Sequence, residues 1–160
     1  MSQLRERTRT STRPLPDEAV LTGTREHPRG RAPAVLRTLG GIAVLVVGAV
    51  HLQQYADGYS SVSTIGPLFL LNFVGATAIG VGLLVPAARV RPLQLPLALG
   101  GIGLAATSFV FLFISEHQPL FGFQEHGYRL GIVVALVAEA AAVVALAAYL
   151  GVRGRGGPER

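Results

Sequence analysis

The sequence predicts an all-α, polytopic membrane protein, a bundle of four transmembrane helices. Half of its 160 residues are hydrophobic and only 14% are charged, whereas a soluble domain carries about 25% charged residues. The mean hydropathy is positive, at +0.48. Four long apolar stretches follow a polar segment that is rich in arginine. We therefore expect one membrane domain with a polar tail at each end.

Residues 1–32 form the polar N-terminal segment, which we expect to be a disordered basic tail in the cytoplasm. The segment holds seven arginines against four acidic residues and is interrupted by prolines. Such a composition buries too little apolar surface to offset the entropy that ordering would cost. Because no nucleic-acid-binding motif accompanies the charge, we expect no nucleic-acid partner. Residues 153–160 are expected to form a second, short cytoplasmic tail.

The membrane domain is expected to comprise residues 33–152. Each apolar stretch offers about 20 residues, which is the length of helix that crosses a hydrocarbon core of roughly 30 Å. The stretches also lack the polar face that a helix of a soluble bundle would show. The expected spans are residues 34–54, 66–85, 93–115 and 130–151.

The placement of arginine predicts the orientation in the membrane. Eight arginines precede or open the first span, Arg89 and Arg91 separate the second span from the third, and three more follow the fourth. The other two connections, residues 55–65 and 116–129, contain only Arg129. Since cytoplasmic connections carry the excess of basic residues, both termini are expected in the cytoplasm. The abundance of Ala, Gly, Val and Arg suggests a GC-rich bacterium, and hence its plasma membrane.

Small residues recur at helical spacing along each span, and we expect these faces to turn inward. In lipid, close packing of small residues supplies much of the attraction between helices. Each stripe includes or adjoins the polar residue of its helix. The stripes are Gly41, Val44, Gly48 and His51; Asn72, Ala76 and Gly80; Ala98, Gly101, Ala105 and Ser108; and Gly131, Ala135, Ala138, Ala142 and Ala145, beside Glu139.

Glu139 lies near the middle of the fourth span and is the most informative residue of the chain. An acidic side chain at this depth is costly unless it is paired or protonated, and it often marks a functional site. Its candidate partners are His51, Asn72, Thr107 and Ser108. A candidate intramembrane polar pocket, opening outward, is formed by His51, Asn72, Ser108 and Glu139. The alternative is a protonated Glu139 that only joins neighbouring helices, with His51 at the membrane surface.

The two predicted outer connections hold a second group of polar residues. Imidazole and carboxylate groups suit Zn²⁺ or Cu²⁺, but no established spacing such as His-Glu-x-x-His is present. We therefore favour solvated loops over a metal site and expect no metal or haem cofactor. The alternative metal ligands are His51, Asp57, Glu116, His117, Glu125 and His126. A haem held by two histidines is less favoured still, since only His51 could face a bundle core.

Residues 51–72, HLQQYADGYSSVSTIGPLFLLN, carry a pattern of their own. A His-Leu pair ends the first span, a Gly-Tyr turn follows, and Ile-Gly-x-Leu-Phe-Leu-Leu opens the second span. This pattern resembles small, uncharacterised four-helix integral membrane proteins of GC-rich bacteria, and the resemblance covers about residues 35–150. It implies the same architecture and brings no activity, substrate or cofactor.

The motifs of common enzyme classes are missing from the sequence. The chain has no cysteine, which excludes disulfides, thiolate metal sites and cysteine nucleophiles. It also has no phosphate-binding loop, no Gly-x-Ser-x-Gly turn and no zinc-protease helix. We therefore expect a non-enzymatic structural or partner-binding subunit whose partners are the lipid bilayer and a second copy or another membrane protein. Two alternatives stay open: a small oligomeric transporter or proton-coupled carrier that uses Glu139, and a redox or metal-handling protein that uses His51 and the outer histidines and glutamates.

Overall fold

The computed structural model describes residues 31–122, 124 and 129–155. Over these residues the chain folds into four long α-helices and two short 3₁₀ turns, η2 (Tyr59–Ser61) and η3 (Arg91–Leu93). All four helices are long and apolar enough to cross a membrane. The predicted four-helix fold is therefore confirmed for the described part of the chain. The helices are α1 (Arg31–Ala56), α2 (Ile65–Leu84), α3 (Gln94–His117) and α4 (Leu130–Arg155).

The helix ends differ from the expected spans in ways that the sequence explains. Helix α1 begins at Arg31, inside the segment expected to be tail, and α4 continues to Arg155. These extra turns carry arginines, whose long side chains can reach the polar surface of a membrane. Helix α2 ends at Leu84, just before Pro86, because proline disfavours helical backbone in the residue before it.

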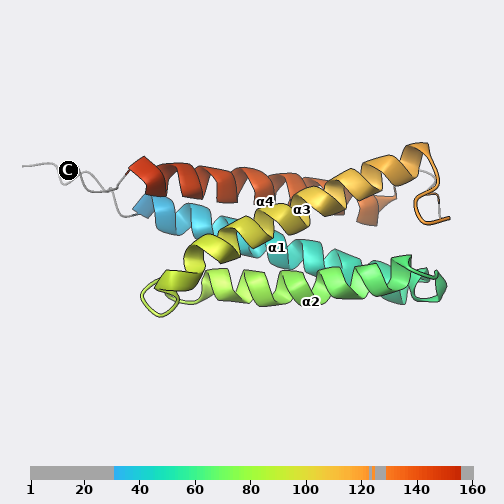
Figure 1. Cartoon of the computed structure of the whole chain (residues 1–160), viewed down its shortest axis with the longest axis horizontal. Coiled ribbons are helices and arrows are strands. Elements are labelled where there is room, and N and C mark those ends of the chain that lie inside the picture. The colour runs from blue at the N-terminus through green and yellow to red at the C-terminus, as the bar shows by residue number, and fades with distance from the viewer. Residues whose placement is uncertain (1–30, 123, 125–128, 156–160) are drawn as a thin grey trace, which may run out of the picture.

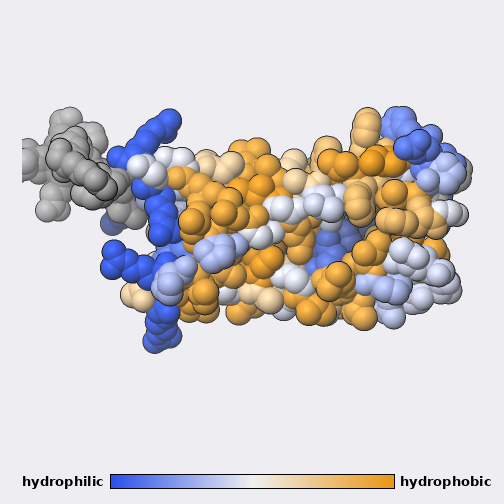
Figure 2. All heavy atoms as spheres, viewed as in Figure 1, coloured by the Kyte–Doolittle hydropathy of each residue, from blue (hydrophilic) through white to orange (hydrophobic). Residues whose placement is uncertain are grey.

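The four helices lie along one common direction (Figure 1). Helix α1 packs mainly on α2 and α4. Helix α3 starts beside α2 and crosses obliquely toward α4, so that α2 and α3 diverge along the bundle (Figure 1). We call the end that holds residues 85–93 and the start of α1 the arginine end; residues 57–64 lie at the opposite end. Figure 2 shows a hydrophobic belt between the two ends, interrupted by a hydrophilic patch where α2 and α3 diverge.

The small-residue stripes do face inward. Most of their members are buried, and Asn72, Ser108, Gly131 and Ala145 are half-buried. Glycine allows α1 to approach α2 closely, since a Cβ added to Gly48 would lie 2.9 Å from the Cβ of Ala76. The buried members are Gly41, Val44, Gly48, His51, Ala76, Gly80, Ala98, Gly101, Ala105, Ala135, Ala138 and Ala142.

An apolar core fills the half of the bundle toward the arginine end. The side chains of Val44, Ala76, Ala105 and Leu146 are fully buried there. Leu146 of α4 is held tightly, because a Cβ added to Gly101 of α3 would lie 2.7 Å from its Cδ1. This half of the bundle therefore has no spare room around Leu146.

Polar side chains close the arginine end. Arg37 is buried, and its Nη1 donates hydrogen bonds to the carbonyl oxygens of Leu83 and, at 2.7 Å, Val85. These carbonyls belong to the last turn of α2, where helical donors run out and where a positive charge is favourable. Gln94 accepts a hydrogen bond of 2.7 Å from the Tyr149 hydroxyl. Arg37 thus ties α1 to α2 at this end, and Gln94 ties α3 to α4.

Candidate functional site

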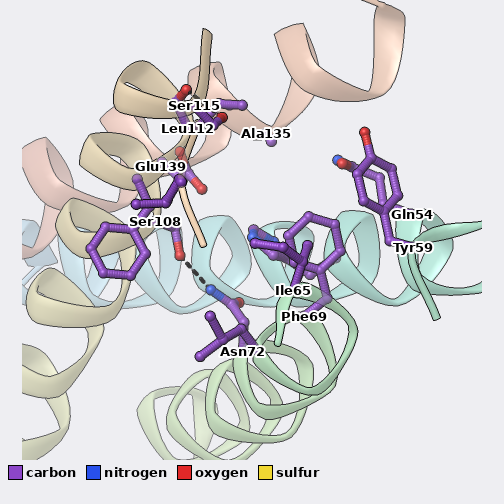
Figure 3. Close-up of a pocket in the computed structure, with 14 residues that line it drawn as sticks. Gln54, Tyr59, Ile65, Phe69, Asn72, Ser108, Leu112, Ser115, Ala135 and Glu139 are labelled. Carbon is purple, nitrogen blue, oxygen red and sulfur yellow. Dashed lines mark hydrogen bonds between the residues drawn. The ribbon is translucent and has the colours of Figure 1, made fainter. Parts of the chain in front are cut away.

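A cavity of about 90 Å³ lies between the four helices, in the half of the bundle away from the arginine end. The four residues predicted to form a polar pocket all line it, and each comes from a different helix. Figure 3 shows Glu139, Ser108 and Ser115 on one side of the cavity and Tyr59 with Gln54 on the other. The structure thus brings His51, Asn72, Ser108 and Glu139 together around one pocket.

Glu139 is the most deeply buried polar residue of the pocket. Its side chain is only 1% exposed, and its Oε2 atom has no hydrogen-bond partner among the described residues. No lysine or arginine belongs to the residues that line the cavity. Thr107, predicted as a candidate partner, is exposed on the outer face of α3, so that part of the prediction is wrong. The carboxyl group therefore faces the cavity without a cation beside it.

Asn72 and Ser108 connect the two helices that diverge at the pocket. The Nδ2 of Asn72 donates a hydrogen bond to the Oγ of Ser108 (Figure 3). The other amide atom, Oδ1, is buried and has no partner among the described residues. The pair therefore bridges α2 and α3 while leaving a second acceptor atom unused.

His51 forms part of the pocket wall and is 7% exposed. It is therefore buried within the bundle. Its Nδ1 lies 2.9 Å from the carbonyl oxygen of Val47. Because a carbonyl can only accept, Nδ1 carries the hydrogen, and the Nε2 of the neutral ring is left as an acceptor. The ring also meets Phe69 edge to face, with centroids 5.1 Å apart.

Tyr59, which was predicted to lie in a turn, also belongs to the pocket. It is buried in η2, lines the cavity and packs on Phe69 with ring centroids 4.9 Å apart. Its hydroxyl oxygen accepts a hydrogen bond from Arg129. A Cβ on Gly66 would lie 2.8 Å from the Tyr59 carbonyl oxygen, so glycine is what lets α2 begin against η2. The signal for this role was the Gly-Tyr pair within the pattern of residues 51–72.

The candidate metal ligands are dispersed over the described structure. His51 lies in the pocket, Asp57 is exposed, and the Nδ1 of exposed His117 lies 2.7 Å from the Phe113 carbonyl oxygen. Glu116 is half-buried, with Oε1 unpartnered among the described residues. Within those residues, no three His, Asp or Glu side chains come close enough to hold a metal ion. The remaining two candidates, Glu125 and His126, lie outside the described residues, so the metal site stays an untested alternative to the predicted solvated loops.

The pocket combines polar atoms with apolar and aromatic walls. Glu139, Asn72 and His51 supply acceptor atoms, whereas Leu68, Phe69, Phe111 and Leu112 are among the apolar residues of the lining. This combination, a few placed polar groups in a mainly apolar concavity, is typical of small-molecule sites. Comparison with known proteins adds no family assignment: no protein-family model, no curated protein and no solved structure matches the chain. The resemblance to small bacterial membrane proteins therefore stays a prediction.

Proposed function

We propose that this protein is an integral membrane protein that binds a small polar solute in the pocket between its helices, with Glu139 as the central binding group. The observation that carries the proposal is the unpartnered Oε2 atom of a side chain that is 1% exposed. A buried polar atom left without a hydrogen bond costs about 1–3 kcal/mol. A bound solute or ordered water would remove that cost.

The alternative role of Glu139, joining helices, receives less support. A carboxyl group that joins helices does so by hydrogen bonding across them, which contributes on the order of 0.6 kcal/mol per bond in membranes. Among the described residues, neither Glu139 Oε2 nor Asn72 Oδ1 has a hydrogen-bond partner. Two unpaired acceptors beside one cavity favour a binding site over a purely structural contact.

The packing of the bundle favours access from one side only. Val44, Ala76 and Leu146 are fully buried in the core that separates the pocket from the arginine end. By the arginine distribution we place both termini in the cytoplasm of a bacterial cell. The pocket then lies in the outer half of the plasma membrane. In this conformation the proposed activity is binding from the outside.

A pair of neighbouring cysteine substitutions tests this function. The native chain has no cysteine, so Ser108→Cys places one thiol in the pocket and Thr107→Cys places one on the outer face of the same helix. Only the thiolate attacks iodomethane, which is small enough for the cavity, forming a methyl thioether and releasing iodide, and a thiol in lipid stays protonated. We expect the Ser108→Cys protein in lipid nanodiscs to react several-fold faster, as measured by mass spectrometry. Equal or slower reaction at position 108 would contradict the binding pocket.

A further inference from the structure

The hydrogen-bonding atoms of the pocket are unevenly used. Asn72 donates to Ser108, His51 Nδ1 donates to Val47, and Ser115 Oγ donates to the Leu112 carbonyl oxygen at 2.9 Å. One hydrogen of Asn72 Nδ2, the Nδ1 hydrogen of His51 and the hydroxyl hydrogen of Ser115 are therefore already used. Glu139 Oε2 and Asn72 Oδ1 have no partner among the described residues. These two buried acceptor atoms favour a ligand that brings hydrogens.

The charged groups of the pocket also favour a ligand that donates hydrogen bonds. Glu139 is the acidic residue of the lining, and no arginine or lysine is among the lining residues. Arg129 is outside this set, and its Nη2 donates to the Tyr59 hydroxyl. A buried carboxylate is stable only when a charge of opposite sign or hydrogen-bond donors compensate it. A cation that carries its own N–H groups supplies both.

The aromatic walls and the volume of the cavity further restrict which ligands can bind. Phe69 and Phe111 contribute aromatic rings to the lining, and the faces of such rings attract cations. The ring of Tyr59 already has the Arg129 guanidinium 5.8 Å from its centroid. The cavity measures about 90 Å³, whereas a cavity of about 150 Å³ accommodates benzene. The pocket thus has room for a molecule of about four non-hydrogen atoms on that scale.

From these observations we propose that the pocket binds a small primary ammonium ion, with its N–H groups directed to Glu139 Oε2 and Asn72 Oδ1. The Nε2 atom of His51 is the third acceptor. Methylammonium and ethylammonium are within the size limit. This inference rests on the proposed function and names the class of solute for the same pocket.

Thermal unfolding of the full chain in lipid nanodiscs, followed by helical circular dichroism, tests the class of ligand. A ligand that binds only the folded protein raises the melting temperature in a saturable way. We expect ethylammonium chloride to raise it by a few degrees relative to sodium chloride at equal ionic strength. Tetramethylammonium, which has no N–H group and exceeds the size limit, should have no effect. Sodium acetate tests whether the pocket instead takes an anion.

Two variants connect the effect to the pocket. In Glu139→Gln, which keeps the shape of the side chain, the ethylammonium shift should disappear. In Thr107→Ala, which alters the outer face of the same helix, the shift should persist. An equal shift in Glu139→Gln, a shift with acetate or tetramethylammonium alone, or no shift with any ammonium ion would overturn the ligand class. If Ser108→Cys is nevertheless the more reactive cysteine, the proposed binding pocket is still supported and only the assignment of an ammonium ligand is wrong.

Discussion

Replacing Gly101 with alanine would place a methyl group 2.7 Å from the Cδ1 of Leu146 and 3.3 Å from the Cγ2 of Val44. Both neighbours are fully buried. Leu146 cannot move away from the added methyl group, because its other methyl group already packs against Gly40. An extra methyl group in a filled core costs about 1–3 kcal/mol, and alanine regains about 1 kcal/mol over glycine in a helix. We therefore expect a net loss of up to about 2 kcal/mol.

Gly103 provides the matched control on the same helix. A Cβ at Gly103 would meet nothing within 4 Å, so Gly103→Ala should keep the helical gain of about 1 kcal/mol. Both variants would be unfolded by adding SDS to mixed micelles, with tyrosine fluorescence as the signal. The reasoning predicts a lower free energy of unfolding for Gly101→Ala than for Gly103→Ala. Equal values for the two variants would refute the tight packing around Leu146.

Three further predictions concern the orientation, the turn before α2 and the arginine end. Ser60→Cys should react with an impermeant thiol reagent in intact cells, and Ala88→Cys only after permeabilisation; the reverse pattern would contradict the orientation. Gly66→Ala should lower the melting temperature because its Cβ would lie 2.8 Å from a carbonyl oxygen of η2, whereas Gly131→Ala, with 3.9 Å to its nearest neighbour, should not. Arg37→Met leaves the last carbonyls of α2 without their donor and should cost about 1–3 kcal/mol in the SDS titration; an unchanged free energy would speak against this capping role.

Much of the fold could be predicted because a membrane restricts the structures that a spanning chain can adopt. Hydropathy alone revealed the four helices, since a span needs about 20 apolar residues whatever its neighbours are. The depth of a residue along its span also restricts which residues can meet. His51, Asn72, Ser108 and Glu139 occupy similar depths and were expected to converge; the structure brings them around one cavity.

The rotation of each helix and the course of the connections were harder to predict. Thr107 and Ser108 are adjacent in sequence and differ only by one step around α3, yet one is exposed and the other lines the pocket. The burial of Tyr59 depends on an irregular turn in which Gly58 has φ 139° and Thr64, a β-branched residue, has φ 68°. Such backbone is uncommon for residues other than glycine, so the Gly-Tyr pair indicated a turn but not the burial of Tyr59.

The central claim is that Glu139 serves ligand binding and does not stabilise the bundle. The substitution Glu139→Met tests this claim most directly. Methionine is similar in length and removes the unpartnered acceptor, so without ligand we expect the free energy of unfolding to rise by about 1–2 kcal/mol. Gln94→Met is the matched control, because buried Gln94 donates to the Ala87 carbonyl oxygen at 2.8 Å and accepts from Tyr149; removing this paired group should destabilise the protein. A loss of stability in Glu139→Met as large as that in Gln94→Met would contradict the account and assign Glu139 to structure.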